Sequence, residues 1–277
     1  MKQGVVDATK IPNFSAVKPA VKKLFWRGKD GWDESWFDHA AAVVGSRRIT
    51  EYGRRVVDKI VPQLVNGGAT VISGMMYGVD QAAHRACMAS GGRTVAVLGW
   101  GIDYKGITAE DLSIMNEIIE KGGLVVSEWE DQAGTLWTFP QRDRIMAALA
   151  DEVYVVEAAV KSGSMITVEW AIKLGKRVWA VPGPVTSRVS DGTNRLIAEK
   201  KAQMWLPEQQ VSQRTTNDAK SDDKNADIYR LLENETLTVD ELARKLMRSV
   251  NEMGAQLSVM TLSGEIKEKD GKYFIGG

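Results

Sequence analysis

Two arginines follow a short apolar run and a glycine, a combination that is suited to binding an anion. The apolar run is residues 40–44, and residues 45–48 read Gly-Ser-Arg-Arg. A helical pattern begins near Thr50, and a turn from strand to helix leaves backbone N–H groups unpaired at the positive end of the helix dipole. Arg47 and Arg48 beside that turn favour phosphate as the anion. An ordinary strand–helix turn with two surface arginines explains the same residues equally well.

Other hydroxyl, glycine and basic residues gather in segments next to the later apolar runs. Serine hydroxyls can donate hydrogen bonds to phosphate, and arginines can neutralise its charge. Glycines in these segments allow the backbone to approach a ligand closely. Because every α/β protein needs turn glycines, the prediction depends on several such segments meeting at one edge. The candidate phosphate-binding residues are Gly45, Ser46, Arg47, Arg48, Ser73, Gly74, Tyr77, Arg142, Arg144, Lys161, Ser162, Gly163 and Ser164.

Acidic and histidine residues near the same segments raise an enzymatic alternative. Asp80 and His84 are four residues apart on one predicted helix, where the carboxylate could orient the imidazole as a general base. A helix-capping Asp80 and a packed or hydrogen-bonded His84 explain the pair more simply. Glu128 and Glu157 end two predicted strands and could act on a nucleotide. With two histidines and one cysteine in the chain, no pattern indicates a metal site.

The elements that must position these residues alternate between strands and helices. Short apolar runs predict strands at residues 40–44, 70–73, 94–98, 124–127, 153–156 and 178–181. Helical patterns between most of these runs predict a parallel sheet covered on both faces, that is, an α/β, doubly wound, Rossmann-like fold. Ligands of such a sheet bind at the carboxyl ends of its strands. The glycine fingerprint of dinucleotide-binding proteins is absent, which counts against an ordinary NAD enzyme.

The composition limits the class of protein. The chain has 277 residues, is 44% hydrophobic, and carries 36 basic and 36 acidic residues. This neutral balance argues against a generally basic nucleic-acid coat, so phosphate binding must come from a local patch. No apolar run approaches the roughly 20 residues that span a bilayer, and the start of the chain lacks a signal-peptide core. We therefore expect a cytoplasmic protein.

Seven motifs occur in an order that resembles a known family. They are Gly45-Ser46-Arg47 with Thr50, Tyr52 and Gly53; Ser73-Gly74 with Gly78-Val79-Asp80 and Ala83-His84; residues 91–99; Phe139-Pro140 with Arg142, Arg144 and Ile145; residues 161–167; residues 180–183; and Gly192-Thr193-Asn194 with Leu196-Ile197. This order resembles the DNA-processing protein A family, also called Smf, over about residues 20–206. The resemblance implies a Rossmann-like domain that binds single-stranded DNA, dimerises and helps to load the RecA recombinase during natural transformation. It implies neither enzymatic activity nor a cofactor.

The resemblance also implies a DNA pocket, and the chain departs from the family pattern at two positions in it. The implied pocket residues are Arg47, Ser73, Gly74, Arg142, Arg144, Ser162, Gly163 and Ser164. Tyr77 stands where the family usually has arginine, and it could stack on a base instead. Asp143 stands where asparagine is usual, and its carboxylate lowers the local positive potential. Residues 163–169 also resemble Rossmann-like nucleoside-monophosphate phosphoribohydrolases, so the alternative is a nucleotide-binding or nucleotide-hydrolysing protein.

The sequence predicts further structural units at both ends of the chain. We expect residues 1–38 to form an N-terminal extension that packs on the core, residues 39–206 the Rossmann-like domain, and residues 207–224 a polar linker. Residues 225–277 show three helical segments and a hairpin at Asp270-Gly271, which is typical of a winged helix. This last part has nine acidic and seven basic residues. We expect it to contact protein rather than read duplex DNA, because DNA reading requires phosphate neutralisation.

Overall fold

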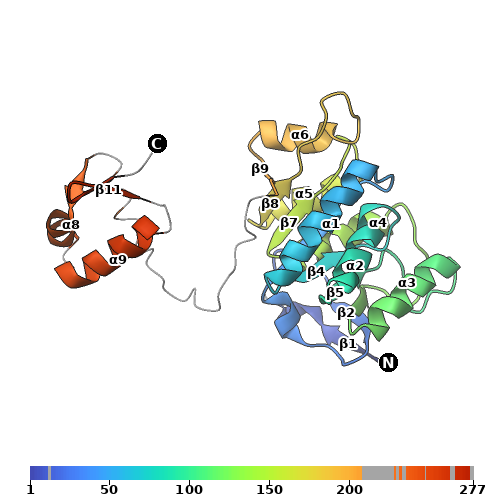
Figure 1. Ribbon diagram of the computed structural model, residues 1–277. Helices are drawn as coiled ribbons and strands as arrows, with labels where there is room; N and C mark the ends of the chain where they lie inside the picture. Colours follow the sequence, from blue (N-terminus) through green and yellow to red (C-terminus); the bar gives the residue numbers. More distant parts are fainter. Residues whose placement is uncertain are drawn as a thin grey trace. The chain divides into compact units, whose positions relative to one another are not determined.

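The protein forms two compact units, residues 1–213 and 214–277. The computed structural model describes residues 1–11, 14–207, 228, 231–232, 235–246, 248–262 and 266–274. The predicted linker, residues 207–224, lies outside the described residues apart from its first position. Each unit is described below by itself (Figure 1).

The larger unit is built on one nine-stranded sheet with the strand order β1-β2-β6-β5-β4-β3-β7-β8-β9. The strands from β6 to β9 in this order are parallel, and β1 and β2 are antiparallel. This arrangement confirms the predicted α/β, mostly parallel sheet. The strands are β1 Lys2–Asp7, β2 Lys23–Gly28, β3 Ala40–Val44, β4 Thr70–Ser73, β5 Thr94–Val97, β6 Leu124–Ser127, β7 Glu152–Val155, β8 Arg177–Ala180 and β9 Gln203–Met204.

Helices cover both faces of this sheet (Figure 1). Successive side chains of a strand point to opposite faces, and β3 shows this alternation. Ala40, Ala42 and Val44 pack with α4, α5 and α6, whereas Ala41 and Val43 pack with α1 and α2. The helices are α1 Glu51–Asn66, α2 Val79–Ala89, α3 Ala109–Glu120, α4 Thr138–Leu149, α5 Ser164–Lys173 and α6 Asp191–Ala198, with short 3-10 helices η1 Ala8–Lys10 and η3 Glu34–Phe37.

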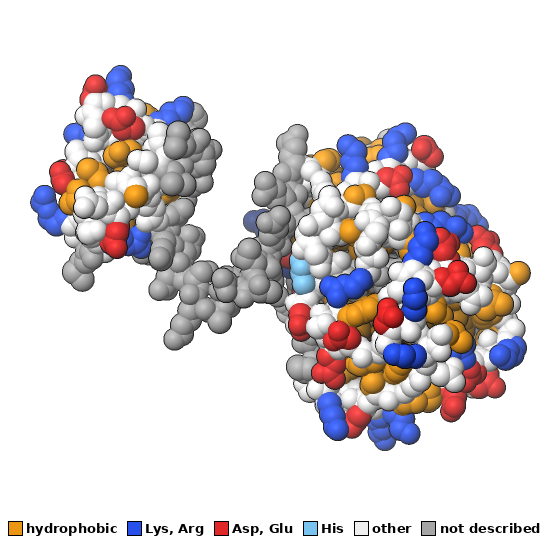
Figure 2. Space-filling view, turned by 60° about the horizontal axis from the view of Figure 1, so that its bottom comes forward, with side chains coloured by type: hydrophobic (Ala, Val, Ile, Leu, Met, Phe, Trp, Pro, Cys, Tyr) orange, Lys and Arg blue, Asp and Glu red, His pale blue; other side chains and the backbone are white. Residues whose placement is uncertain are grey.

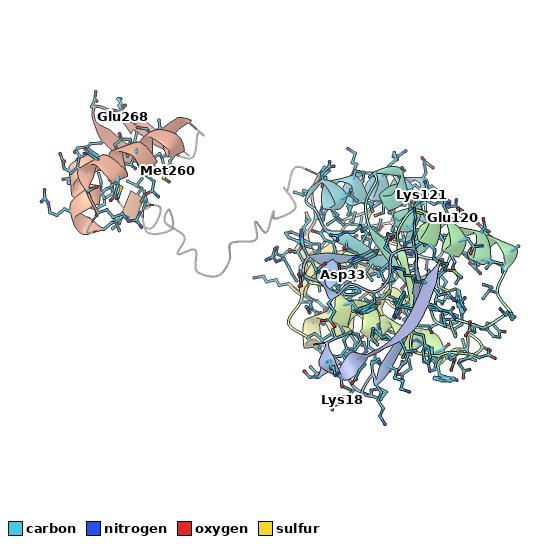
Figure 3. All side chains as sticks on the ribbon, turned by 90° about the horizontal axis from the view of Figure 1, so that it is seen from below. Lys18, Asp33, Glu120, Lys121, Met260 and Glu268 are labelled. Carbon is cyan, nitrogen blue, oxygen red and sulfur yellow. The ribbon has the colours of Figure 1, made fainter. Side chains whose placement is uncertain are left out.

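The start of the chain extends the sheet. Strands β1 and β2 pair with each other, and β2 pairs with β6 at the sheet edge. Gly4 lies against the indole of Trp26, so close that a Cβ there would be 2.9 Å from a ring carbon. Phe14, Val17 and Leu24 are buried in the main core. The lysines around this segment point outward from the packed interior, as Figure 3 shows for Lys18.

The smaller unit has a winged-helix arrangement, in line with the prediction, although most of the first of the three predicted helices lies outside the described residues. Its described helices are α8 Val239–Lys245 and α9 Val250–Leu262, and its sheet joins β10 Leu237–Thr238, β12 Lys272–Phe274 and β11 Lys267–Lys269. Thr238 and Glu241 form a capping box at the start of α8. Asp270 and Gly271 both have positive φ, as a tight hairpin turn requires.

The surface of the larger unit mixes both signs of charge. Figure 2 shows basic and acidic side chains interspersed on one face, in line with the neutral balance of the sequence. Within the described part of the chain, no helix is long and apolar enough to cross a bilayer.

Candidate functional site

A cleft of about 470 Å³ opens where the strand order reverses direction. Strand β3 lies between β4 and β7, so the chain leaves β3 in one direction along the sheet and later returns to its other side. Ligands of doubly wound sheets bind at this switch point, outside the carboxyl ends of the strands. The cleft is lined by residues that include Gly45, Ser46, Arg47, Arg48, Asp80, Leu136, Phe139, Arg142, Asp143, Ser162, Gly163, Ser164 and Thr167.

The first turn of α1, expected to supply the anion site, already carries a carboxylate. Glu157 follows β7, the parallel neighbour of β3, and is buried. Its oxygens accept hydrogen bonds from the Thr50 amide at 2.9 Å and the Thr50 hydroxyl at 2.5 Å. The same hydroxyl accepts a hydrogen bond from Gly53 N at 3.2 Å, so the helix is capped. The end of α1 is therefore not the open anion site, although Arg47 and Arg48 before it line the cleft.

The first turn of α5 lies at this cleft and has no side-chain cap. Gly163 is its N-cap and makes no side-chain capping bond. The hydroxyls of Ser162 and Ser164 lie 2.8 Å apart, and both residues line the cleft. A Cβ added to Gly163 would meet nothing within 4 Å, so a ligand can approach the backbone there. Met165 N and Ile166 N already donate to the Ser162 and Gly163 carbonyls at 3.0 and 2.9 Å. The turn therefore offers a phosphate the two serine hydroxyls and the positive end of the helix dipole.

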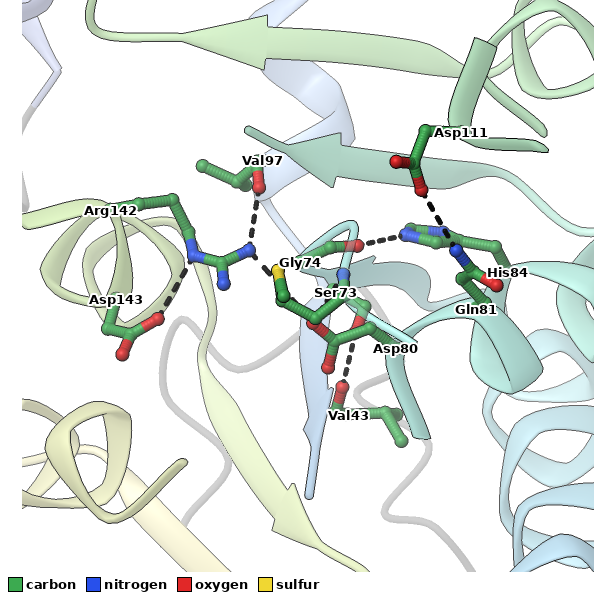
Figure 4. A network of polar contacts seen from close by, with 11 residues as sticks. Val43, Ser73, Gly74, Asp80, Gln81, His84, Val97, Asp111, Arg142 and Asp143 are labelled. Carbon is green, nitrogen blue, oxygen red and sulfur yellow. Dashed lines mark hydrogen bonds and ion pairs between the residues drawn. The ribbon is translucent and has the colours of Figure 1, made fainter. Parts of the chain in front are cut away.

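Arg142 lies at the floor of the cleft between two carboxylates (Figure 4). Its Nε donates to Asp143 Oδ1 at 3.0 Å, and its Nη1 donates to the Val97 carbonyl at 2.8 Å. Asp80 Oδ2 is 4.0 Å from Nη1. Burial raises the pKa of the Asp143 carboxyl to about 6, with Arg142 acting in the opposite direction. Burial also raises the pKa of Asp80, so the two carboxylates hold less charge than exposed ones would at low pH.

Ser73 and Gly74 support the cleft rather than line it. The Ser73 hydroxyl is buried and donates to the Val43 carbonyl at 2.6 Å. Gly74 lies directly against Arg142, and a Cβ there would be 1.9 Å from Nη1 of that arginine. The Gly74 carbonyl lies 2.7 Å from His84 Nε2, and His84 Nδ1 lies 2.7 Å from the Thr94 hydroxyl. Gly74 therefore makes room for the guanidinium.

Arg144, Tyr77 and Lys161 are not among the residues that line the cleft. Arg144 is 2% exposed, and its Nη2 donates to both oxygens of Glu128 at 2.7 and 2.8 Å. Tyr77 is exposed and lines a neighbouring groove. Lys161 is exposed on the segment that precedes α5. The structure thus brings Gly45, Ser46, Arg47, Arg48, Arg142, Ser162, Gly163 and Ser164 together in one cleft.

The cleft is also lined by residues that were not among the candidates from the sequence, and three of them are notable. Thr167 is fully buried, and its hydroxyl has no hydrogen-bond partner among the described residues. Phe139 lies beneath Arg47, whose guanidinium carbon is 5.4 Å from the ring centroid. Leu136, at the rim, is 95% exposed. Thr167 and Phe139 both fall within motifs quoted above, but nothing in the sequence separates their side chains from ordinary core residues.

Of the residues that raised the enzymatic alternative, Asp80 lies in the cleft beside Arg142, and the other three have structural partners. Glu157 caps α1, and Glu128 holds Arg144. Burial lowers the pKa of His84 to about 4, so its imidazole is neutral near pH 7 and enclosed. Among the described residues, no group of three or more His, Cys, Asp or Glu side chains is placed to hold a metal ion.

Comparison with known proteins agrees with this arrangement. The sequence matches the DNA recombination-mediator protein A family over residues 7–216 and the DprA winged helix domain over residues 212–272. DNA processing protein DprA of Streptococcus pneumoniae is 40% identical over 159 residues, which cover 57% of this chain and 55% of that protein. Protein Smf of Escherichia coli is 32% identical over 251 residues, 84% of this chain and 66% of that protein.

Two solved structures have a similar fold. An X-ray structure of DprA from S. pneumoniae gives a TM-score of 0.64 with 32% identity, covering 74% of this chain and 71% of that one. DNA processing protein A from Helicobacter pylori, studied for its single-stranded DNA binding mode, gives a TM-score of 0.64 with 28% identity, covering 74% of this chain and 91% of that one. Since the family match spans most of the sequence, the chain belongs to the DNA recombination-mediator protein A family.

Proposed function

We propose that this chain binds single-stranded DNA in the cleft at the switch point of its sheet and acts as a recombination mediator. The observation that carries the proposal is the uncapped first turn of α5 facing the same cleft as Arg47, Arg48 and Arg142. Helix N-termini, hydroxyls and guanidinium groups all bind phosphate oxygens. The H. pylori relative is described as binding single-stranded DNA.

The rim of the cleft favours a strand with accessible bases over duplex DNA. Leu136 and Trp137 are exposed, and Phe139 lies under Arg47. Unpaired bases stack on aromatic and apolar side chains, a contact that duplex DNA does not offer. The engagement of Glu128 and Glu157 in structural hydrogen bonds supports binding rather than nucleotide hydrolysis. We accordingly propose a binding protein without catalytic residues.

The family also leads us to propose a wider role. A recombination mediator hands its strand to a recombinase, so we propose a RecA-type recombinase as the partner, in the cytoplasm, with the chain acting as a homodimer. Sedimentation measures the dimer, and the rate of recombinase filament formation on coated DNA measures the transfer.

Replacing Arg47 with glutamate tests the cleft directly. Arg47 is exposed, so the variant keeps the fold, whereas Arg142→Glu would place three carboxylates together in the interior. We expect Arg47→Glu to lower the affinity for labelled poly-dT at least tenfold, since charge-assisted hydrogen bonds contribute about 1.5–3 kcal/mol. Fluorescence anisotropy across a salt series, with duplex DNA and AMP as competitors, measures this loss.

Arg55→Glu on the exposed side of α1 is the matched control, because it makes the same charge change outside the cleft. Equal binding by Arg47→Glu and the wild type would remove the cleft as the binding site. Binding of AMP in place of the strand would favour the nucleotide-binding alternative.

A further inference from the structure

A second groove of about 340 Å³ adjoins the cleft on the side of α1 and α2. We name it the arginine groove; it is lined by Arg47, Arg48, Ile49, Arg54, Tyr77, Gly78, Gln81, Ala82, Arg85 and Glu110. Resting on the function proposed above, we propose that the single strand continues out of the cleft into the arginine groove, where Arg54 and Arg85 contact its phosphates and Tyr77 stacks on a base.

The two hollows are connected through the same pair of side chains. Arg47 and Arg48 line both the cleft and the arginine groove. A strand whose phosphate is bound by either arginine is therefore already at the entrance of the groove. Continuity of this kind indicates one extended ligand rather than two separate ones.

The backbone fixes Tyr77 next to these arginines. Val79 N donates to the Ser46 carbonyl at 3.1 Å, which ties the start of α2 to the loop that carries Arg47. Gly78 has φ +86°, and a Cβ there would be 2.2 Å from the Ser46 carbonyl oxygen. Only glycine fits this close approach. Tyr77, one residue earlier, is consequently held at the groove wall rather than on a free loop.

The positive charge of the arginine groove is less neutralised by carboxylates than the positive charge of the cleft. In the cleft, Asp80 and Asp143 flank Arg142. The arginine groove has four arginines and one carboxylate, Glu110, which is 3.8 Å from Arg85. Both side chains of that pair are more than half exposed, at 54% and 57%, so the pair contributes little and Arg85 can exchange Glu110 for a phosphate.

Tyr77 adds the second kind of contact that single strands use. Its side chain is 47% exposed, although tyrosine is usually more buried. Sites for single strands combine a basic track with aromatic side chains on which bases stack, each stack being worth about 1–3 kcal/mol. An aromatic ring among four arginines matches that combination. An acidic protein segment would use the arginines but would gain little from the exposed ring.

A length series of oligo-dT separates the arginine groove from the cleft. We expect wild-type affinity to rise with strand length over about 4 to 16 nucleotides, as the strand reaches the groove. The double variant Arg54→Glu/Arg85→Glu should bind the shortest strand like the wild type and lose at least tenfold for the longest. Its salt slope on the longest strand should fall by about 1.4, because each phosphate contact contributes about 0.7.

Tyrosine variants test the stacking contact separately. Tyr77→Ala should weaken binding of the longest strand by roughly 5- to 100-fold with an unchanged salt slope, and Tyr77→Phe should restore it. Arg55→Glu is the matched control, because Arg55 is next to Arg54 on α1 and lines neither the cleft nor the arginine groove. All of these side chains are exposed, so thermal melting should show an intact fold for each variant.

The outcomes distinguish the two proposals. If the wild type binds neither short nor long strands, the proposed function itself fails. If the wild type binds both, and the groove variants match it on long strands, the proposed role of the arginine groove is refuted and binding in the cleft is retained. An equal loss on short and long strands also overturns the groove, because its residues would then act within the cleft.

Discussion

Replacing Asp143 with asparagine removes a negative charge from the cleft floor and leaves the local geometry in place. The asparagine oxygen can still accept the hydrogen bond that Arg142 Nε donates at 3.0 Å. Arg142 keeps Asp80 and the Val97 carbonyl as its other neighbours. The substitution therefore changes charge with little change in packing, and we expect it to strengthen binding of single-stranded DNA near pH 8.

The size of the effect follows from the charge and its distance from a phosphate. At an effective dielectric constant of about 20, two unit charges about 10 Å apart interact by roughly 1.7 kcal/mol. Removing this repulsion corresponds to an affinity gain on the order of tenfold. Nearby positive charge and solvent screening reduce it, so a gain between about 3- and 10-fold is expected.

The wild type should reach the same state by protonation. Burial raises the pKa of Asp143 to about 6, so the carboxyl is charged at about pH 8 and mostly neutral at about pH 5. Neutralising a carboxylate makes the cleft more positive, and the affinity of the wild type for the strand should therefore rise as the pH falls. His84, whose pKa burial lowers to about 4, stays neutral throughout this range and does not contribute.

Fluorescence anisotropy with labelled poly-dT at a series of pH values measures both effects. The gain from Asp143→Asn should be largest near pH 8 and disappear near pH 5, where the two proteins carry the same charge at this position. Asp58→Asn, on the exposed side of α1, is the control for removal of a distant carboxylate. No gain at pH 8, together with parallel pH profiles, would refute the view that Asp143 opposes binding.

Two further substitutions separate supporting residues from binding residues. Arg144→Ala should leave Glu128 unpaired and lower the free energy of unfolding by about 3 kcal/mol. A melting curve should record this as a decrease in Tm of roughly 6–12 °C. The folded variant should bind poly-dT within about twofold of the wild type, and a tenfold loss of binding would return Arg144 to the site. Gly74→Ala places a Cβ 1.9 Å from Arg142 Nη1, so it should displace the guanidinium, cost about 1–3 kcal/mol of stability and weaken strand binding; wild-type affinity in this variant would mean that the position of Arg142 does not matter.

Strands with continuous apolar residues were predicted well from the sequence. The predicted ranges 40–44, 70–73 and 124–127 are β3, β4 and β6 in the structure. Helix α4 was not predicted, and its composition explains why. Nearly every residue from Arg142 to Leu149 is buried, charged side chains included, so the segment has no polar face to reveal a helical period.

The helical conformation of α4 also explains the placement of Arg142 and Arg144. Residues two positions apart on a helix face different directions. Arg142 therefore faces the cleft, while Arg144 turns to Glu128. The sequence analysis named both arginines as candidate phosphate-binding residues, because the helix that separates them was not predicted.

The location of the uncapped helix end at the cleft depended on contacts between distant segments. Thr50 and Glu157 are 107 residues apart in the sequence, and the parallel pairing of β3 with β7 brings them together. Without that pairing, the end of α1 is the obvious anion site. The same physical rule, applied to the folded chain, selects α5 instead.

The missing side-chain cap of α5 links ligand binding to the stability of that helix. A side-chain cap is worth about 1 kcal/mol; α1 takes its cap from Thr50 and α8 from Thr238, whereas Gly163 supplies none. Helices α2, α4 and α6 also begin without a side-chain cap, but among these four helices only α5 begins beside two serine hydroxyls that line the cleft. A phosphate held by these hydroxyls would lie at the positive end of the helix dipole, so strand binding should stabilise the start of α5.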